Sequence, residues 1–407
     1  MPNRKLLFFY RVVLLPNPIT FSVGKLQALI LKTLGITFLA FGLSFVLMQP
    51  FSFSAASLLS SADGNDFTIN DFYNKVADSR HVTTLDSNIV IVDIAACDRE
   101  GIAEIIETVS LCSPRTVGLD VVFAEPKEHD SRLIEAIKNC PNLVLAVSVE
   151  ADSAAKTFHI DESSYFTPEL ENVELAAINF PTGSSNRTIR EFKPDYMTAD
   201  GKRIPSFALA TSRKQSGEIV DSFMKRGNDL EFITYYSRIF KTISPEELAD
   251  RAEELIDKIV LIGAANDPYD LHVTPVSAAM SGINIHAYTV ATILSGRYFY
   301  QLHRYTNWAI AFISCFIVIM ISLMINIGVK GLIMRIVQVT LLYLTIRLGY
   351  YFFIEHNIII NFSYSLMMLT FGLFAGDIWI GMTTIITWIY NKINHIRESR
   401  TENIYTQ

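Results

Sequence analysis

Four long apolar stretches interrupt the chain, and each is long enough to cross a bilayer as a helix. The first covers residues 33–53, and the other three cover residues 305–327, 331–354 and 359–390. An apolar helix of about 20 residues spans the hydrocarbon core of a membrane. The first stretch is too long and too far from the start for a signal peptide, so we favour a retained anchor over a cleaved signal. The pattern predicts one N-terminal and three C-terminal transmembrane helices.

Basic residues in the short connecting segments predict the orientation of these helices. They are Arg4, Lys5, Arg11, Lys25 and Lys32 before the first stretch, Lys330 after the second, and Lys392, Arg397 and Arg400 after the fourth. Short segments rich in lysine and arginine stay in the cytoplasm. Residues 1–32 and the tail 391–407 are therefore predicted to be cytoplasmic, and residues 54–304 to form a domain outside the cytoplasm. Membrane lipids are accordingly expected partners.

Three charged residues lie inside the apolar stretches: Arg335, Arg347 and Asp377. A charge at membrane depth needs a partner or access to water. Arg335 and Asp377 are equally far from His356 at the tip between the last two helices, so the two side chains could meet at one depth. The alternative is that Arg335 extends to the nearby membrane surface. Arg347 is expected to face a neighbouring helix or subunit.

The region between the first and second stretches alternates between strand-like and helix-like patterns. Its apolar, β-branched runs cover residues 88–94, 116–123, 142–149 and 258–263, and its helical patterns cover 99–111, 131–137 and 282–294. This alternation predicts an α/β domain with a mainly parallel sheet. Turn signals in residues 150–215 predict an antiparallel extension. A helix start is expected at residues 244–247, and Asn70 is expected to cap a short helix.

The amino-acid composition excludes several classes of function for this chain. Half of the residues are hydrophobic, 18% are charged and the net charge is −7, without the basic stripe that nucleic-acid binding needs. The four cysteines show no metal-binding spacing, so neither a metal nor a cofactor is expected. Cys112 and Cys140 each follow a helix and precede a strand, and a disulfide between them is one hypothesis. Reduced, buried thiols are the other.

Candidate binding residues lie where the predicted parallel strands end. Asp93 and Asp120 close two of the strands, and Asp270, Thr274 and His286 follow a third. Ligands of open α/β sheets bind outside the carboxyl ends of the strands. These five residues, with His272 nearby in sequence, are therefore candidates for holding a cation or a polar ligand. The alternative is that the carboxylates cap loops and helix N-termini.

The sequence contains no motif of a common catalytic site. It has no GxSxG elbow, phosphate-binding P-loop or HExxH motif, and no cysteine with a plausible base. A phosphatase of the haloacid-dehalogenase type needs two aspartates one residue apart after its first strand, and each strand here offers one. We therefore expect a protein that is not an enzyme.

Five segments together resemble the CHASE2 family of extracytoplasmic sensory domains. They read GLDVVFAEP at 118–126, HDSRLIEAI at 129–137, KIVLIGAA at 258–265, DLHVTP at 270–275 and GINIHA at 282–287. One anchor before the domain and three spans after it are also typical of this family. The resemblance implies a sensory domain in the periplasm, hence a multi-pass protein of the bacterial inner membrane.

Three departures from the family pattern qualify the resemblance. Many members of the family carry a Trp-Pro-rich stretch that contains an arginine after the first strand, and this chain has residues 97–103 (CDREGIA) in its place. The usual Asp-Gly-x-x-Arg element is replaced by residues 183–187, or by Arg190. The family normally carries a cytoplasmic kinase or cyclase domain, whereas residues 391–407 are too few to fold alone, although Ile386, Tyr390, Ile393 and Ile396 could continue the last helix with an apolar face.

The resemblance therefore implies a sensor or receptor subunit that binds a small molecule or an envelope protein. Its signal would pass to a separate cytoplasmic output protein. The alternative is a membrane scaffold whose outer domain docks an envelope complex without any ligand. An acidic pocket would favour the first hypothesis and a broad apolar patch the second. The sequence leaves the ligand, the output partner and a homo-oligomer open.

Overall fold

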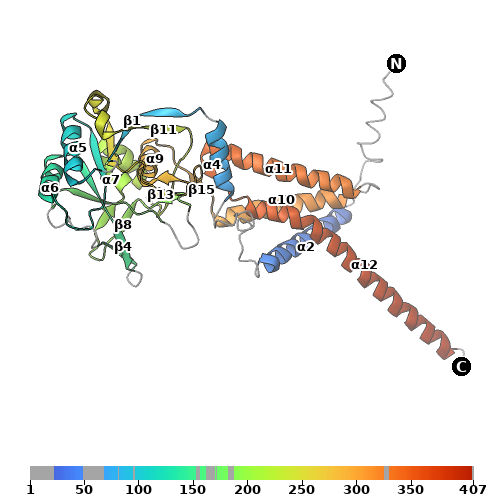
Figure 1. Cartoon of the computed structure of the whole chain (residues 1–407). Helices are drawn as coiled ribbons and strands as arrows, with labels where there is room; N and C mark the ends of the chain where they lie inside the picture. The colour runs from blue at the N-terminus through green and yellow to red at the C-terminus, as the bar shows by residue number, and fades with distance from the viewer. Residues whose placement is uncertain are drawn as a thin grey trace, which may run out of the picture. The chain divides into compact units, whose positions relative to one another are not determined.

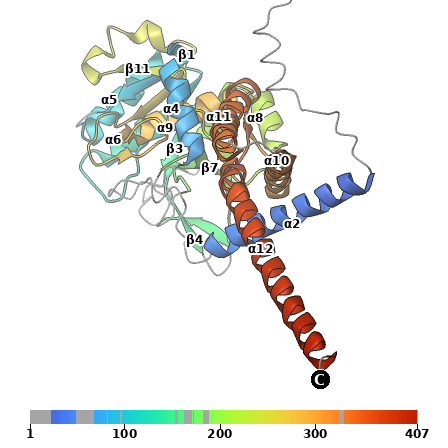
Figure 2. The same ribbon diagram turned by 90° about the vertical axis from the view of Figure 1, so that its right-hand side faces the viewer.

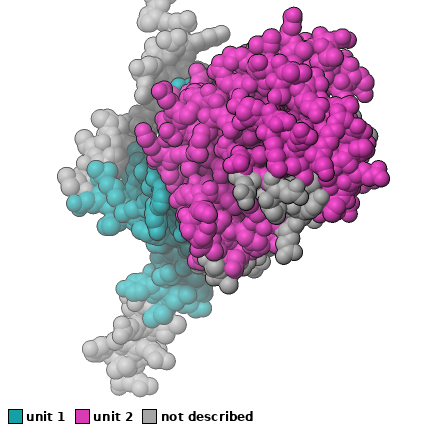
Figure 3. All heavy atoms as spheres, turned by 90° about the vertical axis from the view of Figure 1, so that its left-hand side faces the viewer, with its two compact units in different colours: residues 1–52, 302–351, 360–407 teal, residues 53–301, 352–359 magenta. Residues whose placement is uncertain are grey.

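The computed structural model describes residues 23–48, 68–80, 82–94, 97–152, 156–161, 170, 172–181, 188–324 and 330–405. The chain divides into two compact units, which Figure 3 colours separately. The helical unit comprises Met1–Ser52, Leu302–Tyr351 and Ile360–Gln407, and the domain unit comprises Phe53–Gln301 and Phe352–Ile359. The short apolar segment at 6–15, which could lie in a membrane interface, and the polar, glycine-containing junction at 61–66 lie outside the described residues.

The domain unit is built on a six-stranded sheet in which every neighbouring pair is parallel (Figure 1). Its order is β11 (Arg238–Ile243), β1 (Thr84–Asp93), β12 (Ile259–Gly263), β2 (Thr116–Asp120), β3 (Leu143–Val147) and β6 (Glu174–Ala177). The predicted parallel sheet is thus confirmed. The order also places β12 between β1 and β2, although it follows both by more than a hundred residues in sequence.

Helices cover both faces of this sheet. They are α5 (Arg99–Leu111) and α6 (Asp130–Asn139) on one face, and α7 (Phe207–Gln215) and α9 (Gly282–Leu294) on the other, with α4 (Ile69–Arg80) and α8 (Gly217–Met224) completing the unit. Along β1, Val90 and Val92 enter the first core, whereas Ile89 and Ile91 enter the second. A strand buried on both faces is apolar at nearly every position, which is why the sequence shows continuous runs.

Residues 150–215 contain the expected antiparallel strands and also two elements that the sequence did not predict. Three small antiparallel pairs are present: β4 (Val149–Asp152) with β5 (Thr157–Ile160), β8 (Asp195–Met197) with β9 (Arg203–Pro205), and β7 (Glu191–Phe192) with β10 (Glu231–Phe232). However, β6 joins the main sheet in parallel, and α7 was not predicted. The first six residues of α7 are all buried, so its sequence lacks the one-sided periodicity that marks an amphipathic helix.

Of the two predicted helix starts, the one at residues 244–247 has the expected position and the cap at Asn70 is wrong. The segment after Ser244 forms only a short 3₁₀ turn, Pro245–Glu247, and the Ser244 side chain donates or accepts no capping hydrogen bond. A second 3₁₀ turn, Ala252–Leu255, follows it. Helix α4 begins at Ile69, and the Asp71 carboxylate accepts a hydrogen bond from the Thr68 backbone N–H (2.6 Å). Asn70 therefore lies inside the helix, because Asp71 satisfies the free amide at its start.

The helical unit contains four helices that are long and apolar enough to cross a membrane. The helices are α2 (Val23–Met48), α10 (Arg304–Met324), α11 (Lys330–His356) and α12 (Ser363–Tyr405), and their apolar spans are Leu26–Ser44, Arg304–Met324, Leu332–His356 and Tyr364–Ile393. The expected number and order of apolar helices are confirmed. Figure 2 follows α12 as a single helix to the C-terminal end of the described chain.

Small residues allow the helices of this unit to approach closely. A Cβ atom added to Gly372 of α12 would lie 2.9 Å from the Cys315 sulfur of α10, and one added to Gly35 of α2 would lie 3.2 Å from the Trp379 ring. Cys315 is fully buried there. Apolar helices in lipid gain little from the hydrophobic effect, so close packing at small residues is what holds them together.

The three intramembrane charges are placed as follows. Arg335 donates a hydrogen bond to the Gln338 side chain (3.0 Å), and Gln338 in turn donates to the Leu369 carbonyl (3.2 Å). Arg335 and Asp377 line one hollow of about 260 Å³ in the helical unit. Among the described residues no ion pair within 4.0 Å joins the two side chains. Arg347 lies exposed on α11.

Gly372→Ala is expected to destabilise the helical unit by about 1–3 kcal/mol, because the added methyl group meets the Cys315 sulfur. Gly376→Ala is the matched control, since nothing lies within 4 Å of its added Cβ and alanine is the better helix former. Thermal unfolding of the full chain in detergent should show a lower Tm for the first variant only. Equal Tm values would contradict close packing at Gly372.

Candidate functional site

Three neighbouring strands end in one row at the carboxyl edge of the sheet. In the registers of β1 with β12 and of β12 with β2, Asp93 pairs with Gly263 and Gly263 pairs with Asp120. Gly263 lies between Asp93 and Asp120 in this row, and as a glycine it has no side chain to separate their carboxylates. A Cβ there would lie 2.6 Å from the Ile283 side chain and 3.1 Å from the Asp120 Cβ. Only glycine lets α9 and Asp120 come this close to the strand end.

Asp93 is committed to holding the loop that follows β12. Its carboxylate accepts hydrogen bonds from the Ala265 backbone N–H (2.9 Å) and the Asn266 side-chain amide (2.8 Å). The side chain is 7% exposed. A buried carboxylate needs such donors to remain charged. For Asp93 these contacts support the expected alternative, a carboxylate that fixes a loop.

Asp270 lies at the start of α9 and is paired with a histidine. Its carboxylate accepts a hydrogen bond from the Gly282 backbone N–H (3.0 Å), and its second oxygen lies 3.0 Å from His272 Nε2. A Cβ on Gly282 would come within 2.7 Å of this carboxylate. The two-stranded ribbon of β13 (Leu271–His272) and β14 (Met280–Ser281) holds the segment in place. A negative charge at a helix N-terminus is stabilised by the free amides there.

Asp120 and His286 lie in the electrostatic field of this pair. The pKa of Asp120 is raised to about 7, first by loss of hydration and then by the neighbouring Asp270 charge, while His272 acts to lower it. Burial lowers the pKa of His286 to about 3, so its ring is neutral. That ring stacks on Phe180 (centroids 4.6 Å apart) and meets the edge of Phe207 (5.0 Å). Asp120 is therefore the group of the site whose charge changes near neutral pH.

The predicted site residues thus divide into two sets. Asp120 and His286 each lie in the electrostatic field of Asp270 and His272, whereas Asp93 serves the loop and Thr274 closes a turn by exchanging hydrogen bonds with the Ser277 backbone. Two participants were absent from the predicted set: Asn266 and Phe180. Asn266 and Phe180 depend on contacts between distant segments that carry no local pattern.

The loop after β2 is anchored by Arg99 at the start of α5. The guanidinium lies 3.2 Å from the Asp130 carboxylate, donates to the Glu125 carbonyl (3.3 Å) and stacks over the Phe123 ring (4.2 Å). All three partners belong to the GLDVVFAEP and HD segments. Arg99 comes from the CDREGIA stretch, so the residues that depart from the family pattern still supply an arginine to this loop.

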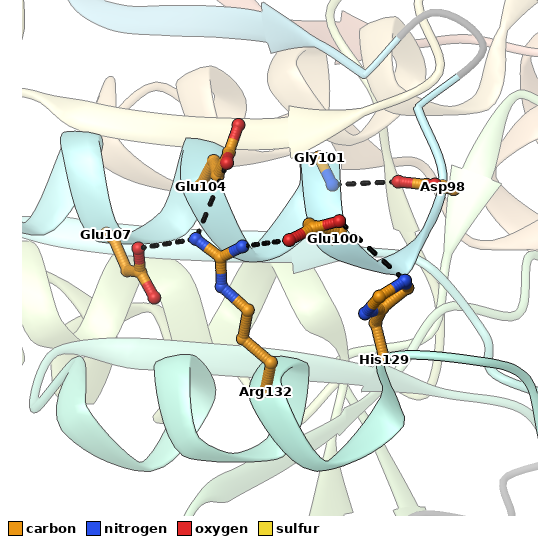
Figure 4. A network of polar contacts seen from close by, with 7 residues as sticks. All are labelled: Asp98, Glu100, Gly101, Glu104, Glu107, His129 and Arg132. Atoms are coloured by element: carbon orange, nitrogen blue, oxygen red, sulfur yellow. Dashed lines mark hydrogen bonds and ion pairs between the residues drawn. The ribbon is translucent and has the colours of Figure 1, made fainter.

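A second polar network lies on the surface beside this anchor, between α5 and α6 (Figure 4). Arg132 of α6 contacts three glutamates of α5 spaced along one helix face: Glu100, Glu104 and Glu107. Asp98 caps α5 by accepting a hydrogen bond from the Gly101 N–H (2.9 Å). The side chains of this network are half exposed to solvent, so water screens their charges. The network links α5 to α6.

The described residues contain no group of three or more His, Cys, Asp or Glu side chains that could hold a metal ion. All four cysteines are free thiols, so Cys112 and Cys140 are not joined in this structure. An open hollow of about 570 Å³ lies away from the strand ends. It is lined by Asp195, Arg203, Pro205, Leu209, Arg213, Asp221, Met224 and Lys225. None of the candidate residues lines it.

Comparison with known proteins identifies the domain. The sequence model of the CHASE2 domain matches residues 54–325, more than half of the chain. The match includes the row of strand ends, the Arg99 anchor and the Asp270 segment. No curated protein and no solved structure matches the chain.

Asp120→Asn is expected to alter how stability depends on pH. The folded pKa of about 7 lies above the ordinary value of 3.8, so between these values the folded protein binds more protons than the unfolded chain. Stability should therefore fall as pH rises through this window and level off above about pH 7. The variant should lack this slope and melt higher than the parent at pH 8. His286, whose pKa is lowered, has the opposite slope in both proteins.

The measurement is Tm against pH for the parent, for Asp120→Asn and for Asp267→Asn. Asp267 accepts a hydrogen bond from the Tyr269 N–H in the neighbouring loop and controls for the loss of an exposed carboxylate. Parallel curves for the parent and Asp120→Asn would contradict the raised pKa.

Arg99→Ala is expected to destabilise the domain by about 3–5 kcal/mol, because it leaves the nearly buried Asp130 carboxylate without its cation. Arg132→Ala, in the exposed network of Figure 4, should change stability far less. Chemical unfolding of both variants separates these effects. Comparable losses would show that the surface network matters as much as the buried anchor.

Proposed function

The chain belongs to the CHASE2 family of extracytoplasmic sensory domains, and on this premise we propose that it is a receptor subunit of the bacterial inner membrane. Its domain unit would lie in the periplasm and bind a small molecule or an envelope protein. Its output would be read by a separate cytoplasmic protein, and the chain itself would catalyse no reaction.

The observation that carries this proposal is one sensory domain in a chain with four membrane-capable helices. The basic residues of the predicted cytoplasmic segments support the orientation. The sheet edge supports the binding role, because Asp120, Asp270 and His272 bring titratable groups together at the edge where α/β proteins bind ligands. A ligand there can shift the domain only by binding two of its states with different affinity.

Helix α12 supports the output role. Its 43 residues extend about 65 Å, roughly twice the thickness of a hydrocarbon core. The helix extends 12 residues past its apolar span Tyr364–Ile393, so the expected continuation of the last helix is present as far as Tyr405. The exposed apolar side chains Ile385, Ile386, Trp388, Ile389, Tyr390 and Ile393 belong to the end of the apolar span, where lipid would cover them. The part of α12 after this span is what a helical partner at the cytoplasmic surface would contact.

A specific observation also favours the scaffold alternative. An apolar hollow of about 530 Å³ opens beside the C-terminal end of α5. Leu111 and Ile256 line it and are 86% and 53% exposed. Exposed apolar side chains of this size are typical of protein contact surfaces. An envelope protein docked there would need no ligand at the strand ends.

Affinity capture in mild detergent should separate the two functions. We expect the full chain to capture a specific cytoplasmic protein that a chain ending at Asn391 does not. If every form captures the same envelope proteins and no cytoplasmic protein, the receptor hypothesis fails. Loss of those envelope proteins on Leu111→Ser would then support the scaffold.

A further inference from the structure

The last turn of α11 belongs to the domain unit. Residues Phe352–Ile359 are part of that unit, whereas the rest of α11 belongs to the helical unit. Phe353 is only 1% exposed. Its ring stacks on Phe299 (centroids 4.6 Å apart) and packs near Tyr73 of α4 (5.7 Å) and Tyr236 (6.1 Å). Aromatic clusters of this kind bury large area and have fixed geometry, so the end of this helix is held by the domain core.

Backbone pairing strengthens this hold. Strand β15 (Tyr300–Gln301), just before α10, pairs in parallel with β16 (Ile358–Ile359), just after α11. The Tyr300 N–H also donates to the Asn357 carbonyl (2.8 Å), where Asn357 has a positive φ of 51°. Two segments that lead directly into different membrane-capable helices are therefore hydrogen-bonded to each other within the domain unit.

A buried ion pair lies beside this cluster. The Arg190 guanidinium donates two hydrogen bonds to the Asp71 carboxylate, at 2.8 and 2.7 Å, and the two side chains are 12% and 3% exposed. A small cavity is shared by Asp71, Arg190, Phe353, Ile359 and Pro275. A bidentate pair with so little water access holds one geometry. It ties α4 to the segment after residue 187 at the place where α11 ends.

The segment 270–275 connects this region with the candidate site. At one end the Asp270 carboxylate lies 3.0 Å from His272 Nε2, at the edge of the sheet. In the middle, Val273 accepts a hydrogen bond from the Ile189 N–H (2.8 Å), directly before Arg190. At the other end Pro275 lines the cavity next to Phe353. Six consecutive residues thus touch both the site and the structure that holds α11.

We propose that the segment 270–275 couples the Asp120–Asp270–His272 cluster to the last turn of α11, so that the domain transmits its state through Phe352–Ile359. This inference rests on the proposed receptor function and names how its site is read. A change at Asp270 shifts the backbone at Val273, which shifts Ile189 and the Arg190–Asp71 pair. The aromatic cluster around Phe353 responds, and α11 carries the change onward. Coupling of this kind acts equally in both directions.

Hydrogen exchange of the full chain in lipid nanodiscs tests the coupling. Since the ligand is unidentified, the probe is a substitution at the site: Asp270→Asn, with Asp267→Asn as its control on the same loop. We expect Asp270→Asn to speed exchange several-fold at 188–191 and 352–359, whereas Asp267→Asn changes only its own loop. Unchanged exchange in β12 (Ile259–Gly263) shows that the fold is intact.

The reverse experiment uses Phe353→Leu, which keeps apolar volume but loses the stacked rings. Its control is Tyr351→Leu, because Tyr351 is 50% exposed on the same helix. We expect faster exchange at 270–275 for the first variant only. If each variant affects only its own neighbourhood, the coupling is refuted. Hydrogen exchange needs no partner protein, so its result is independent of the affinity capture. If the coupling fails but a cytoplasmic protein is captured, this inference alone is overturned. If the coupling is intact but no cytoplasmic protein is captured, the receptor function alone is overturned.

Discussion

The arrangement of the domain depends on the position of β12 between β1 and β2. These three strands are buried on both faces, so their backbone groups must pair with one another and water cannot replace a missing neighbour. Because the pairing is parallel and in register, Asp93, Gly263 and Asp120 end in one row. The loop after β12 then crosses the carboxyl edge, where Asp93 holds it, and leads into the Asp270 segment. Both the candidate site and its connection to α11 follow from this placement.

Charge at the sheet edge is balanced by short-range contacts. Asp93 has two amide donors, and Asp270 has a helix N-terminus and His272. Asp120 is the carboxylate whose pKa burial raises most, to about 7. Burial makes the charged form of Asp120 unfavourable, so binding a proton, a cation or a hydrogen-bond donor at this carboxylate would stabilise the folded domain.

The helical unit follows a different rule, because lipid removes the hydrophobic drive between helices. Contact there occurs at Gly35 and Gly372, where backbones approach large or buried side chains. The expected Arg335–Asp377 pair is replaced by a hydrogen bond from Arg335 to Gln338, which a sequence count of helix depth could not reveal. Residues of opposite charge at equal depth meet only if both helices also turn the same faces toward each other.

Sequence alone determined the elements with strong local patterns. The apolar runs, the strands β1, β2, β3 and β12 of the parallel sheet, and the helices α5, α6 and α9 all follow from periodicity, since burial on one or two faces leaves a regular signature. It also placed Asp120, Asp270 and His286 near one edge, because parallel strands share it. Tertiary structure decided what periodicity does not encode: the strand order, the buried helix α7, and the donors that reserve Asp93 and Thr274 for local contacts. It also decided that Arg190 pairs with Asp71 and that Phe353 belongs to the domain, because such contacts join residues more than fifty positions apart and leave no pattern within either segment.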